Sequence, residues 1–379
     1  MSNVARTSEP AKTGGRNAAP DPVSVRERKI LGIIETARAK RHKFRDERIT
    51  TAHGAGGKAT ASLIEGLLLP AFANETLSAL ADAGTVSIDG TAVAMTTDSF
   101  VVKPLRFPGG SIGELAVNGT VNDLAMAGAK PQAITLSLIL EEGLEAGVLR
   151  AEVEAIAQAA REAGVTIIAG DTKVVGRGQA DQMYVCTTGI GKIDPRAILS
   201  PDSLSPGDRI LVSGPIGLHG TAIMLARGEF ELGAEVESDT RPLWPAVDAM
   251  LDRAGPGLRC LRDATRGGVA SVLNELARAS GVAMLVREAA VPVPPAVAGA
   301  AELLGIDPMH VANEGVLVAV VDPAHSDEAL AALRASGLGE AAEIGEVKTE
   351  PPGMVLVETS FGGKRVMDQL VGDPLPRIC

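Results

Sequence analysis

Four aspartates of this chain stand where carboxylates commonly bind metal-complexed nucleotides. Asp98, Asp171 and Asp263 each close a largely apolar run, and ligand crevices of open sheets form at strand ends. Asp123 lies inside a helical pattern. Magnesium prefers oxygen ligands and is usually held by one or two carboxylates plus substrate phosphates. A single such aspartate is more often a cap or turn residue, but four of them beside glycine-rich turns indicate a magnesium–nucleotide site.

A glycine-rich segment with a lysine, His53–Lys58, runs into a predicted helix. Glycines allow backbone N–H groups to approach a phosphate, and a helix N-terminus favours an anion. The segment is not a Walker A loop, because Ala52 stands at the first glycine position of that motif and Ala59 follows Lys58. Taken alone, the pattern fits a simple turn as well as a phosphate-binding loop.

A second cationic segment, Arg262–Gly268, contains two arginines and ends in two glycines. Arg262 and Arg266 offer forked donors suited to phosphate, although an ion pair beside a helix cap explains the same residues. The turn Gly214–Gly220 contains His219, which we expect to be a helix-start residue rather than a catalyst.

The last residue of the chain is a cysteine, Cys379, preceded by prolines at 374 and 376. Proline-rich segments are extended, at about 3.1 Å per residue, so a thiol at the end of one can move between sites. Thiols are good nucleophiles even where little thiolate is present. An incidental surface cysteine is the alternative, and we expect no prenylation because no residue follows the cysteine. Cys186 and Cys260 lie in apolar runs and are expected to be core residues.

The composition excludes several classes of protein. Aromatic residues make up only 2% of the chain, which argues against stacking platforms for nucleic acid, and a net charge of −11 repels phosphate backbones. Three cysteines without CxxC spacing indicate neither a disulfide framework nor a zinc site and fit a reducing compartment. No stretch approaches the roughly 18 apolar residues of a membrane helix, and the N-terminus lacks the apolar core of a secretory signal. We therefore expect a cytoplasmic protein that binds neither nucleic acid nor membrane.

Residues 1–48 differ from the rest of the chain. They contain 12 Lys and Arg against 6 Asp and Glu, so they carry +6 and the remaining residues carry −17. The first 25 residues are rich in Ala, Pro, Ser and Gly, a composition typical of disorder. Apolar residues within 26–48 recur at helical spacing, so this part is either a solvated basic arm or a helix that docks on an acidic partner.

From residue 49 onward, short apolar strands alternate with helical patterns, which predicts a two-domain α+β or α/β enzyme. We place the first domain at 49–195, the second at 196–367 and a tail without periodicity at 368–379, with a proline-rich linker over 194–207. The patterns predict helices over 57–73, 111–128, 144–163, 218–227, 245–253 and 267–280. They predict strands over 91–97, 132–140, 165–169, 182–192, 209–212, 282–286, 315–321 and 343–347.

Together these segments resemble the HypE family of hydrogenase maturation factors. That family belongs to the superfamily of aminoimidazole ribonucleotide synthetase, selenophosphate synthetase and thiamine monophosphate kinase. The resemblance covers about residues 50–379 and leaves residues 1–48 without a counterpart. The glycine-rich and aspartate motifs mark the superfamily, whereas the terminal Pro376-Arg-Ile-Cys marks HypE. The motifs are His53-Gly-Ala-Gly-Gly-Lys, Thr97-Asp-Ser-Phe, Phe107-Pro-Gly-Gly, Asn122-Asp-Leu-Ala, Leu140-Glu-Glu-Gly, Gly170-Asp-Thr-Lys-Val-Val, Arg262-Asp-Ala-Thr-Arg-Gly-Gly, Ala312-Asn-Glu-Gly and Pro376-Arg-Ile-Cys.

The resemblance implies an ATP- and Mg²⁺-dependent dehydration. A HypF-type carbamoyltransferase would load a carbamoyl group onto Cys379, ATP would phosphorylate the carboxamide oxygen, and loss of phosphate would leave a thiocyanate. The cyano group would pass to iron held by HypC and HypD, as a ligand of the [NiFe]-hydrogenase centre. With Cys379, the implied catalytic residues are Lys173, which would stabilise oxyanion charge, and Glu314, which would accept an N–H proton. The implied nucleotide-binding residues are Gly56, Gly57, Lys58, Asp98, Asn122, Asp171, Thr172 and Arg266, and the implied metal ligands are Asp98, Asp123 and Asp263.

The resemblance also implies the fold. An N-terminal domain would form a dimeric barrel through its β-sheet, a C-terminal α/β domain would follow, and a flexible tail would swing between an inward and an outward position. Two alternatives remain. One is a sister synthetase or kinase, although selenophosphate synthetase is disfavoured because no cysteine precedes Cys186. The other is a non-catalytic maturation scaffold, which the intact aspartates, Lys173 and Glu314 disfavour.

Overall fold

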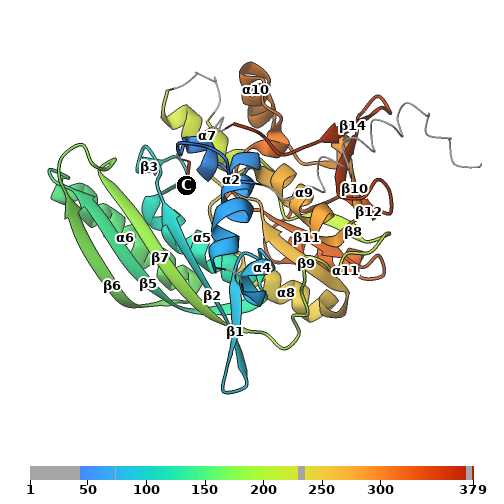
Figure 1. Cartoon of the computed structure of the whole chain (residues 1–379), viewed down its shortest axis with the longest axis horizontal. Helices are drawn as coiled ribbons and strands as arrows, with labels where there is room; N and C mark the ends of the chain where they lie inside the picture. Colours follow the sequence, from blue (N-terminus) through green and yellow to red (C-terminus); the bar gives the residue numbers. More distant parts are fainter. Residues whose placement is uncertain (1–42, 73, 229–234, 373–377) are drawn as a thin grey trace, which may run out of the picture. The chain divides into compact units, whose positions relative to one another are not determined.

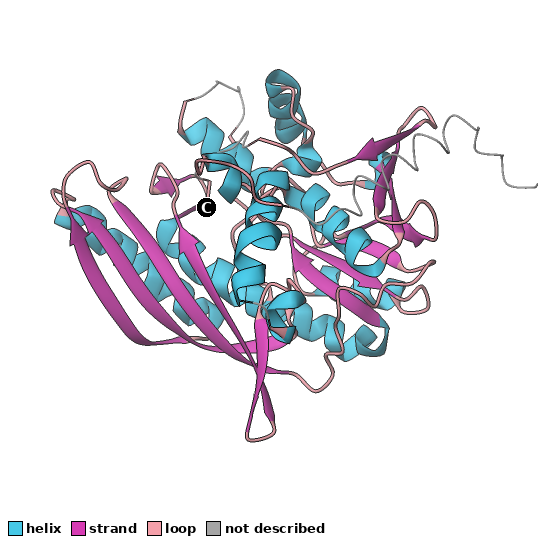
Figure 2. Ribbon diagram, in the orientation of Figure 1, coloured by secondary structure: helices cyan, strands magenta, loops and turns pink. Residues whose placement is uncertain are grey.

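The computed structural model describes residues 43–72, 74–228, 235–372 and 378–379. The predicted disorder of residues 1–25 and most of the predicted helix over 26–48 lie outside the described residues. Residues 43–48 are described and are not helical. The described residues group into one compact unit that contains two large β-sheets (Figure 1, Figure 2).

The first half of the chain builds a five-stranded sheet in the order β1-β2-β7-β5-β6. β5 and β6 run parallel, and the other neighbours are antiparallel. Along β7, buried and half-buried residues alternate, as expected when helices cover one face of a sheet. The strands are β1 (Gly84–Ile88), β2 (Thr91–Phe100), β5 (Ala129–Glu141), β6 (Thr166–Val175) and β7 (Met183–Ile193).

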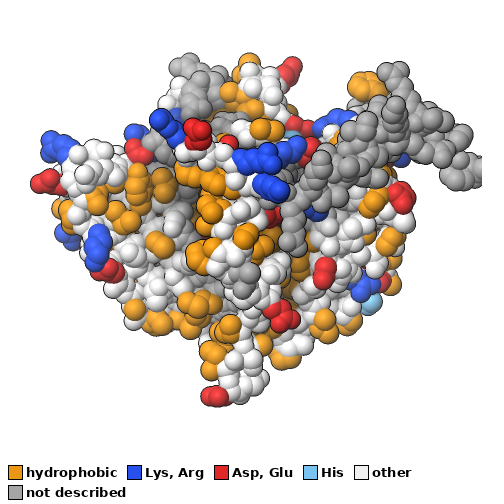
Figure 3. Space-filling model, viewed as in Figure 1, with side chains coloured by type: hydrophobic (Ala, Val, Ile, Leu, Met, Phe, Trp, Pro, Cys, Tyr) orange, Lys and Arg blue, Asp and Glu red, His pale blue; other side chains and the backbone are white. Residues whose placement is uncertain are grey.

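Two helices cover one face of this sheet. α5 (Ile112–Met126) packs against β2, β5 and β7, and α6 (Ala146–Ala163) lies along α5. The Ser111 hydroxyl caps α5 by accepting a hydrogen bond from the Gly113 N–H at 3.1 Å. The strand register places Val86, Ile88 and Met95 on the opposite face, which we call the open face; all three are exposed. Figure 3 shows hydrophobic side chains at the surface over the region where Figure 1 draws the five-stranded sheet.

The second half builds a seven-stranded sheet in the order β14-β13-β10-β12-β8-β11-β9. Only β10 and β13 run parallel. The strands are β8 (Arg209–Val212), β9 (Leu258–Asp263), β10 (Ala283–Arg287), β11 (Leu317–Val321), β12 (Ala342–Lys348), β13 (Met354–Glu358) and β14 (Lys364–Met367).

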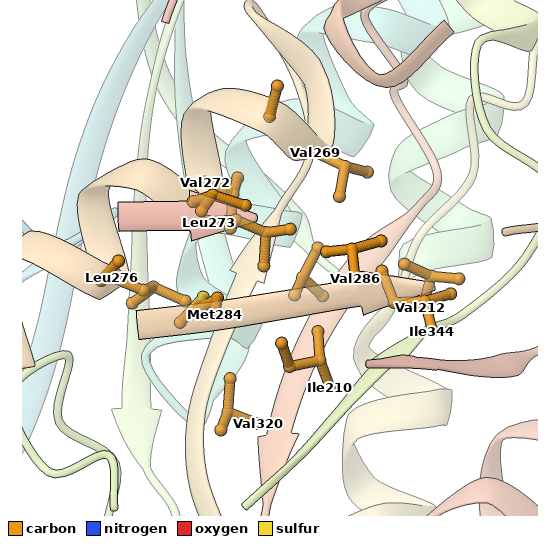
Figure 4. Close-up of a cluster of buried hydrophobic side chains, with 14 of the residues drawn as sticks. Ile210, Val212, Val269, Val272, Leu273, Leu276, Met284, Val286, Val320 and Ile344 are labelled. Atoms are coloured by element: carbon orange, nitrogen blue, oxygen red, sulfur yellow. The ribbon is translucent and has the colours of Figure 1, made fainter. Parts of the chain in front are cut away.

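Helices cover both faces of the second sheet. α9 contributes Val269, Val272, Leu273 and Leu276 to the core on one face (Figure 4), and α8 and α11 cover the other. Every residue of β11 is therefore buried, which explains its continuously apolar sequence. The helices of this half are α7 (Leu218–Ala226), α8 (Trp244–Ala254), α9 (Gly268–Ser280), α10 (Pro295–Leu304) and α11 (Ser326–Ala335).

The predicted helix over 57–73 is present but interrupted. α2 (Lys58–Leu63) passes into a π-helical turn, η2 (Ile64–Leu68), and then into α3 (Leu69–Phe72). Pro70 explains the change, because it has no N–H to donate to a carbonyl one turn earlier. The remaining short elements are η1 (Thr51–Gly54), α4 (Glu75–Ser78), β3 (Arg106–Phe107), β4 (Gly110–Ser111), η3 (Gly255–Gly257), η4 (Glu288–Ala290) and η5 (Pro308–His310).

The two halves meet at α5. Its last residues, Ala125 and Met126, belong to the same buried cluster as side chains of α8 and of the second sheet. The predicted mixed α and β layout is thus confirmed, with one sheet in each half. Among the longer elements, the sequence patterns did not predict β1, β13, β14, α10 or α11, and they marked β9 only as the apolar run that Asp263 closes. Within the part of the chain that the structure describes, no helix is both long and apolar enough to cross a membrane.

Candidate functional site

A cavity of ≈ 1200 Å³ opens among α2, β2, the start of α9 and the C-terminal residue. This volume is ample for a drug- or nucleotide-sized ligand, since ligand pockets commonly measure about 300–1,000 Å³. Residues from both halves of the chain line it, and many of them were predicted as site residues. The predicted residues in its lining are Gly56, Gly57, Asp98, Asp123, Asp263, Arg266, Glu314 and Cys379.

One wall of the cavity is acidic. Burial raises the pKa of the Asp123 and Asp263 carboxyls well above their ordinary values, and neighbouring carboxylates raise both further. Burial also raises the pKa of Asp98, while Arg266 opposes that shift. The Thr96 hydroxyl donates to Asp123 at 2.7 Å and favours its ionised form. Gathering such carboxyls is costly without a cation, because each one disfavours ionisation of the others.

The carboxylates of this wall are ligands of the type that Mg²⁺ prefers, although they do not form a complete coordination shell. Among residues 43–72, 74–228, 235–372 and 378–379, no three His, Cys, Asp or Glu side chains are grouped closely enough to hold a metal ion by themselves. Mg²⁺ usually keeps several waters and shares its remaining positions between one or two carboxylates and substrate phosphates. The wall therefore suits a cation that arrives together with a phosphorylated ligand.

The glycine-rich segment packs against the residues that precede α9. Gly56 has φ +72°, and a Cβ there would lie 2.5 Å from the Arg266 carbonyl oxygen, so only glycine fits. Arg266 in turn donates from Nη1 to the Gly54 carbonyl at 2.7 Å. Lys58 does not line the cavity; its Nζ donates to the Asp368 carboxylate at 2.7 Å. The structure thus places the glycines at the cavity, whereas the side chain of Lys58 pairs with Asp368 outside the cavity lining.

The C-terminal cysteine lies inside the cavity. Val101 donates its backbone N–H to a terminal oxygen of Cys379 at 3.0 Å, and the preceding Ile378 is buried in an apolar cluster. Burial raises the pKa of the Cys379 thiol to about 12, Arg266 opposes this shift, and Glu314 adds to it. The docked thiol is therefore protonated at neutral pH.

Glu314, whose carboxyl contributes to the raised pKa of this thiol, is itself buried. Burial raises its pKa well above the ordinary value, and the charge of Asp263 raises it further. Its Oε1 atom is buried without a hydrogen-bond partner among the described residues. Its backbone N–H donates to Asp239 Oδ1 at 3.0 Å. Glu314 thus offers a fixed, poorly solvated carboxyl with a free acceptor position.

Asn122, predicted to bind the nucleotide, does not line the cavity. This side chain is buried outside the cavity lining, and its Nδ2 donates to the carbonyls of Arg241 at 3.0 Å and Glu314 at 3.2 Å. Its Oδ1 accepts from the Leu243 N–H at 2.8 Å. Asn122 therefore ties α5 to the segment that carries Glu314, and both of its amide N–H groups are used in doing so.

Asp171, Thr172 and Lys173 are not brought to the cavity within one chain. They lie in the middle of β6, an edge strand, rather than at a strand end as predicted for Asp171. Asp171 and Lys173 form an ion pair at 2.7 Å and are 61% and 67% exposed. The register through β5 to β7 places both on the open face, together with Cys186. Within one chain, Asp171 and Lys173 therefore do not face the cavity.

The three cysteines occupy three different environments. Cys260 is buried in the core, as predicted. Cys186 is only half-buried, on the open face, so the prediction of a core position was wrong. The alternating pattern of β7 could have predicted the position of Cys186, because every second residue of this strand faces away from α5.

Sequence reasoning missed three residues that shape the site. Asp82 joins the acidic wall and pairs with Arg262, but it lies in a loop without periodicity, so nothing in the sequence distinguished it. Asp239 is buried, and desolvation raises its pKa to about 6. His219 begins α7 as predicted but also contacts the main chain of Ile378. These contacts join segments far apart in sequence.

Comparison with known proteins identifies two family models in the chain. The AIR synthase related protein, N-terminal domain, matches residues 80–193, and the AIR synthase related protein, C-terminal domain, matches residues 205–357. The matches divide near the predicted linker and together span most of the chain.

Individual proteins match a larger share of this chain than the two family models do. The carbamoyl dehydratase HypE of Bradyrhizobium diazoefficiens is 48% identical over 332 residues, which cover 87% of this chain and 96% of that protein. A crystal structure of a HypE–HypF complex contains a chain 43% identical, with a TM-score of 0.78, covering 82% of this chain and 100% of the other. A crystal structure of HypE in complex with ATP is also 43% identical, with a TM-score of 0.73, covering 88% of this chain and 100% of the other.

Proposed function

Because this chain belongs to the HypE family of carbamoyl dehydratases, among the AIR synthase related proteins, we propose that it uses ATP to dehydrate a carbamoyl group carried on Cys379. The product is a thiocyanate that supplies the cyanide ligand of the [NiFe]-hydrogenase iron. The observation that carries this proposal is the position of Cys379, at the end of the chain and inside the cavity that also contains Glu314 and Arg266.

The reaction removes the elements of water from the S-carbamoyl group. The carboxamide oxygen attacks the γ-phosphorus of ATP, ADP leaves, and one N–H proton is lost, which gives an S-bound imidate phosphate. The remaining N–H proton is then lost and the C–O bond breaks. Phosphate departs, and the product on the sulfur is a thiocyanate, S–C≡N. An oxygen that is a poor leaving group as part of an amide becomes a good one as a phosphate ester, which is why ATP is consumed.

Two residues of the cavity suit these steps. Glu314 accepts an N–H proton, since its Oε1 has no other partner among the described residues and its carboxylate is poorly solvated. Arg266 faces both the thiol and the acidic wall, and its charge would offset that of the phosphates. Phosphoryl transfer depends mainly on positioning and on neutralising charge, which this arrangement supplies.

ATP would occupy the cavity with Mg²⁺ at the acidic wall. Asp98, Asp123 and Asp263 would hold the cation, which neutralises phosphate charge when bound. The glycine-rich segment at Gly56 and Gly57 would cover the phosphates. The solved HypE–ATP complex supports nucleotide binding by a protein of the same family.

Lys173 would act from a second copy of the chain. The open face carries exposed apolar residues, including Val86, Ile88 and Met95. Packing the open faces of two copies against each other would form the composite barrel of a homodimer. Lys173 lies on that face. A second copy would bring Lys173 toward the carboxamide, where its charge would stabilise the developing oxyanion.

The tail would leave the cavity to meet the partners. A HypF-type carbamoyltransferase would load Cys379, and HypC and HypD would accept the cyano group. The solved HypE–HypF complex supports the first of these contacts. A position inside the cavity for dehydration and one outside for loading and delivery explain why the cysteine stands at a chain end.

The test is intact-mass analysis after incubation with the carbamoyltransferase, carbamoyl phosphate and ATP. We expect a carbamoyl adduct on Cys379 that loses the mass of water only when ATP is present. A Cys379→Ala variant that gained the same adduct would overturn the proposal. Hydrolysis of ATP alone would not decide, because sister synthetases and kinases hydrolyse ATP too.

A further inference from the structure

The imidazole of His219 contacts the main chain next to the terminal cysteine. Its Nε2 lies 2.6 Å from the carbonyl oxygen of Ile378, and its Nδ1 lies 2.8 Å from the Ser238 hydroxyl. The ring is fully buried and stands edge-on to Phe107, with centroids 5.5 Å apart. His219 is thus enclosed and bonded through both of its nitrogens.

Only one arrangement of hydrogens satisfies these contacts. Burial lowers the pKa of His219 to about 4, so the ring is neutral at physiological pH. A carbonyl oxygen can only accept, so Nε2 carries the hydrogen and donates to Ile378. Nδ1 then accepts from the Ser238 hydroxyl, whose oxygen accepts from the Thr240 N–H at 3.2 Å. The chain of bonds fixes both the tautomer and the direction of the ring.

Contacts of several kinds hold the last two residues. The His219 bond holds the Ile378 carbonyl, the Ile378 side chain is buried in an apolar cluster with Phe107, and Val101 holds a terminal oxygen of Cys379. Of these, only the His219 bond depends on a specific side-chain donor. It is therefore the contact that one substitution can remove without emptying the apolar cluster.

We propose that His219 is a positioning residue that keeps Cys379 in the cavity during dehydration, and that loss of its bond to Ile378 releases the cysteine for loading and delivery. His219 touches no reacting atom and acts through the tail. The inference rests on the proposed function for its consequence in catalysis, whereas docking of the cysteine does not depend on that function.

The same short segment also positions the proton acceptor. Ser238 orients His219, and its neighbour Asp239 accepts the backbone N–H of Glu314. The carrier thiol and Glu314 are thus placed relative to each other through consecutive residues. This arrangement explains why a histidine that does not line the cavity would affect dehydration.

The test compares alkylation of Cys379 by iodoacetamide in four folded variants. A Cys186→Ser background makes intact mass report Cys379, because Cys260 is buried. We expect His219→Ala to raise the alkylation rate about fivefold or more, the usual effect of losing one buried hydrogen bond. His219→Gln, whose amide nitrogen can replace Nε2, should react like the parent protein. His219→Asn, which can replace only Nδ1, should react like His219→Ala. His325→Ala removes an imidazole at the start of another helix and should change nothing.

A second readout separates this inference from the proposed function. In carbamoylated protein, ATP-dependent loss of water should slow in His219→Ala and His219→Asn and recover in His219→Gln, with the KM for ATP unchanged. If His219→Ala does not fold, Ser238→Ala should give a smaller increase in alkylation of the same kind. Equal alkylation of the parent and of folded His219→Ala, or of the Gln and Asn variants, would overturn the inference. Failure of the parent protein to lose water would refute the proposed function and leave the alkylation result standing.

Discussion

Asp239 accepts a hydrogen bond from the backbone N–H of Glu314 at 3.0 Å, while its other carboxyl oxygen is buried without a partner among the described residues. The next residue after Glu314, Gly315, lies so close to the Asp239 carbonyl that a Cβ would clash with it. Glu314 is thus held by its main chain against a segment that belongs to the loop before α8. The orientation of its carboxyl depends on a residue that does not line the cavity.

Replacing Asp239 with Asn should change how stability depends on pH. Burial raises the pKa of Asp239 to about 6 in the folded protein, above the ordinary value of 3.8. The folded state therefore holds this proton more tightly, so its stabilising effect is complete below about pH 4 and is lost as pH rises through about 6. The unfolding free energy of the parent relative to Asp239→Asn should fall by on the order of 3 kcal/mol across that range. Chemical denaturation at several pH values measures this difference.

Asp239→Ala serves as the companion variant because it also removes the acceptor for Glu314. With that N–H unpaired, the Glu314 carboxyl should shift, and single-turnover dehydration should slow about 10- to 100-fold more than in Asp239→Asn. A parallel pH dependence of stability in the parent and Asp239→Asn would contradict the assigned pKa. Equal dehydration rates in the two variants would contradict the positioning role.

Replacing Glu314 with Gln should abolish proton acceptance without emptying the site. We expect ATP-dependent loss of water to fall by about 10²–10⁴-fold, the usual contribution of a general base. Alkylation of Cys379 should become faster at a given pH, because the Glu314 carboxyl contributes to the raised pKa of that thiol. Both rates are read by mass spectrometry, and Glu340→Gln, an exposed position, is the control. Unchanged dehydration would remove Glu314 from the mechanism.

The contrast between β11 and β6 shows how far sequence patterns reach. β11 is buried on both faces, so its run of apolar residues predicted a strand correctly. β6 is exposed along almost its whole length, and its second half, from Gly170 to Lys173, has no apolar pattern to recognise. The strand was therefore predicted too short, and Asp171 was placed at an end that does not exist.

In the site, too, local sequence patterns predicted some features and not others. Asp98, Asp123 and Asp263 meet in one cavity as predicted, because strand ends and the adjoining helix follow from local patterns. The hydrogen bond from Asn122 to the Arg241 carbonyl and the contact of His219 with Ile378 join segments more than 100 residues apart. No spacing rule reports such contacts, since they arise only when the two halves pack.

Replacing Gly56 with Ala should destabilise the glycine-rich segment and weaken nucleotide binding. Its φ of +72° and the 2.5 Å approach of an added Cβ to the Arg266 carbonyl both oppose a side chain. A non-glycine residue in that conformation costs about 1–3 kcal/mol. Thermal unfolding with and without ATP measures the effect. Gly54→Ala is the matched control, because a Cβ there meets nothing closer than 3.9 Å; equal losses in both variants would contradict the argument.

Lys173 should act on the Cys379 of another copy, since Cys379 lines the cavity of its own chain and Lys173 does not. Lys173→Met and Cys379→Ala should each lose ATP-dependent dehydration when pure. Mixing equal amounts of the two variants under conditions that exchange subunits should restore activity at about half of the Lys173→Met chains, because each mixed dimer contains one site with both residues intact. Intact mass of the Lys173→Met chains after incubation with the carbamoyltransferase, carbamoyl phosphate and ATP measures this, and unmixed samples are the control. No restoration in a mixture shown to contain mixed dimers would mean that Lys173 serves its own chain or does not take part.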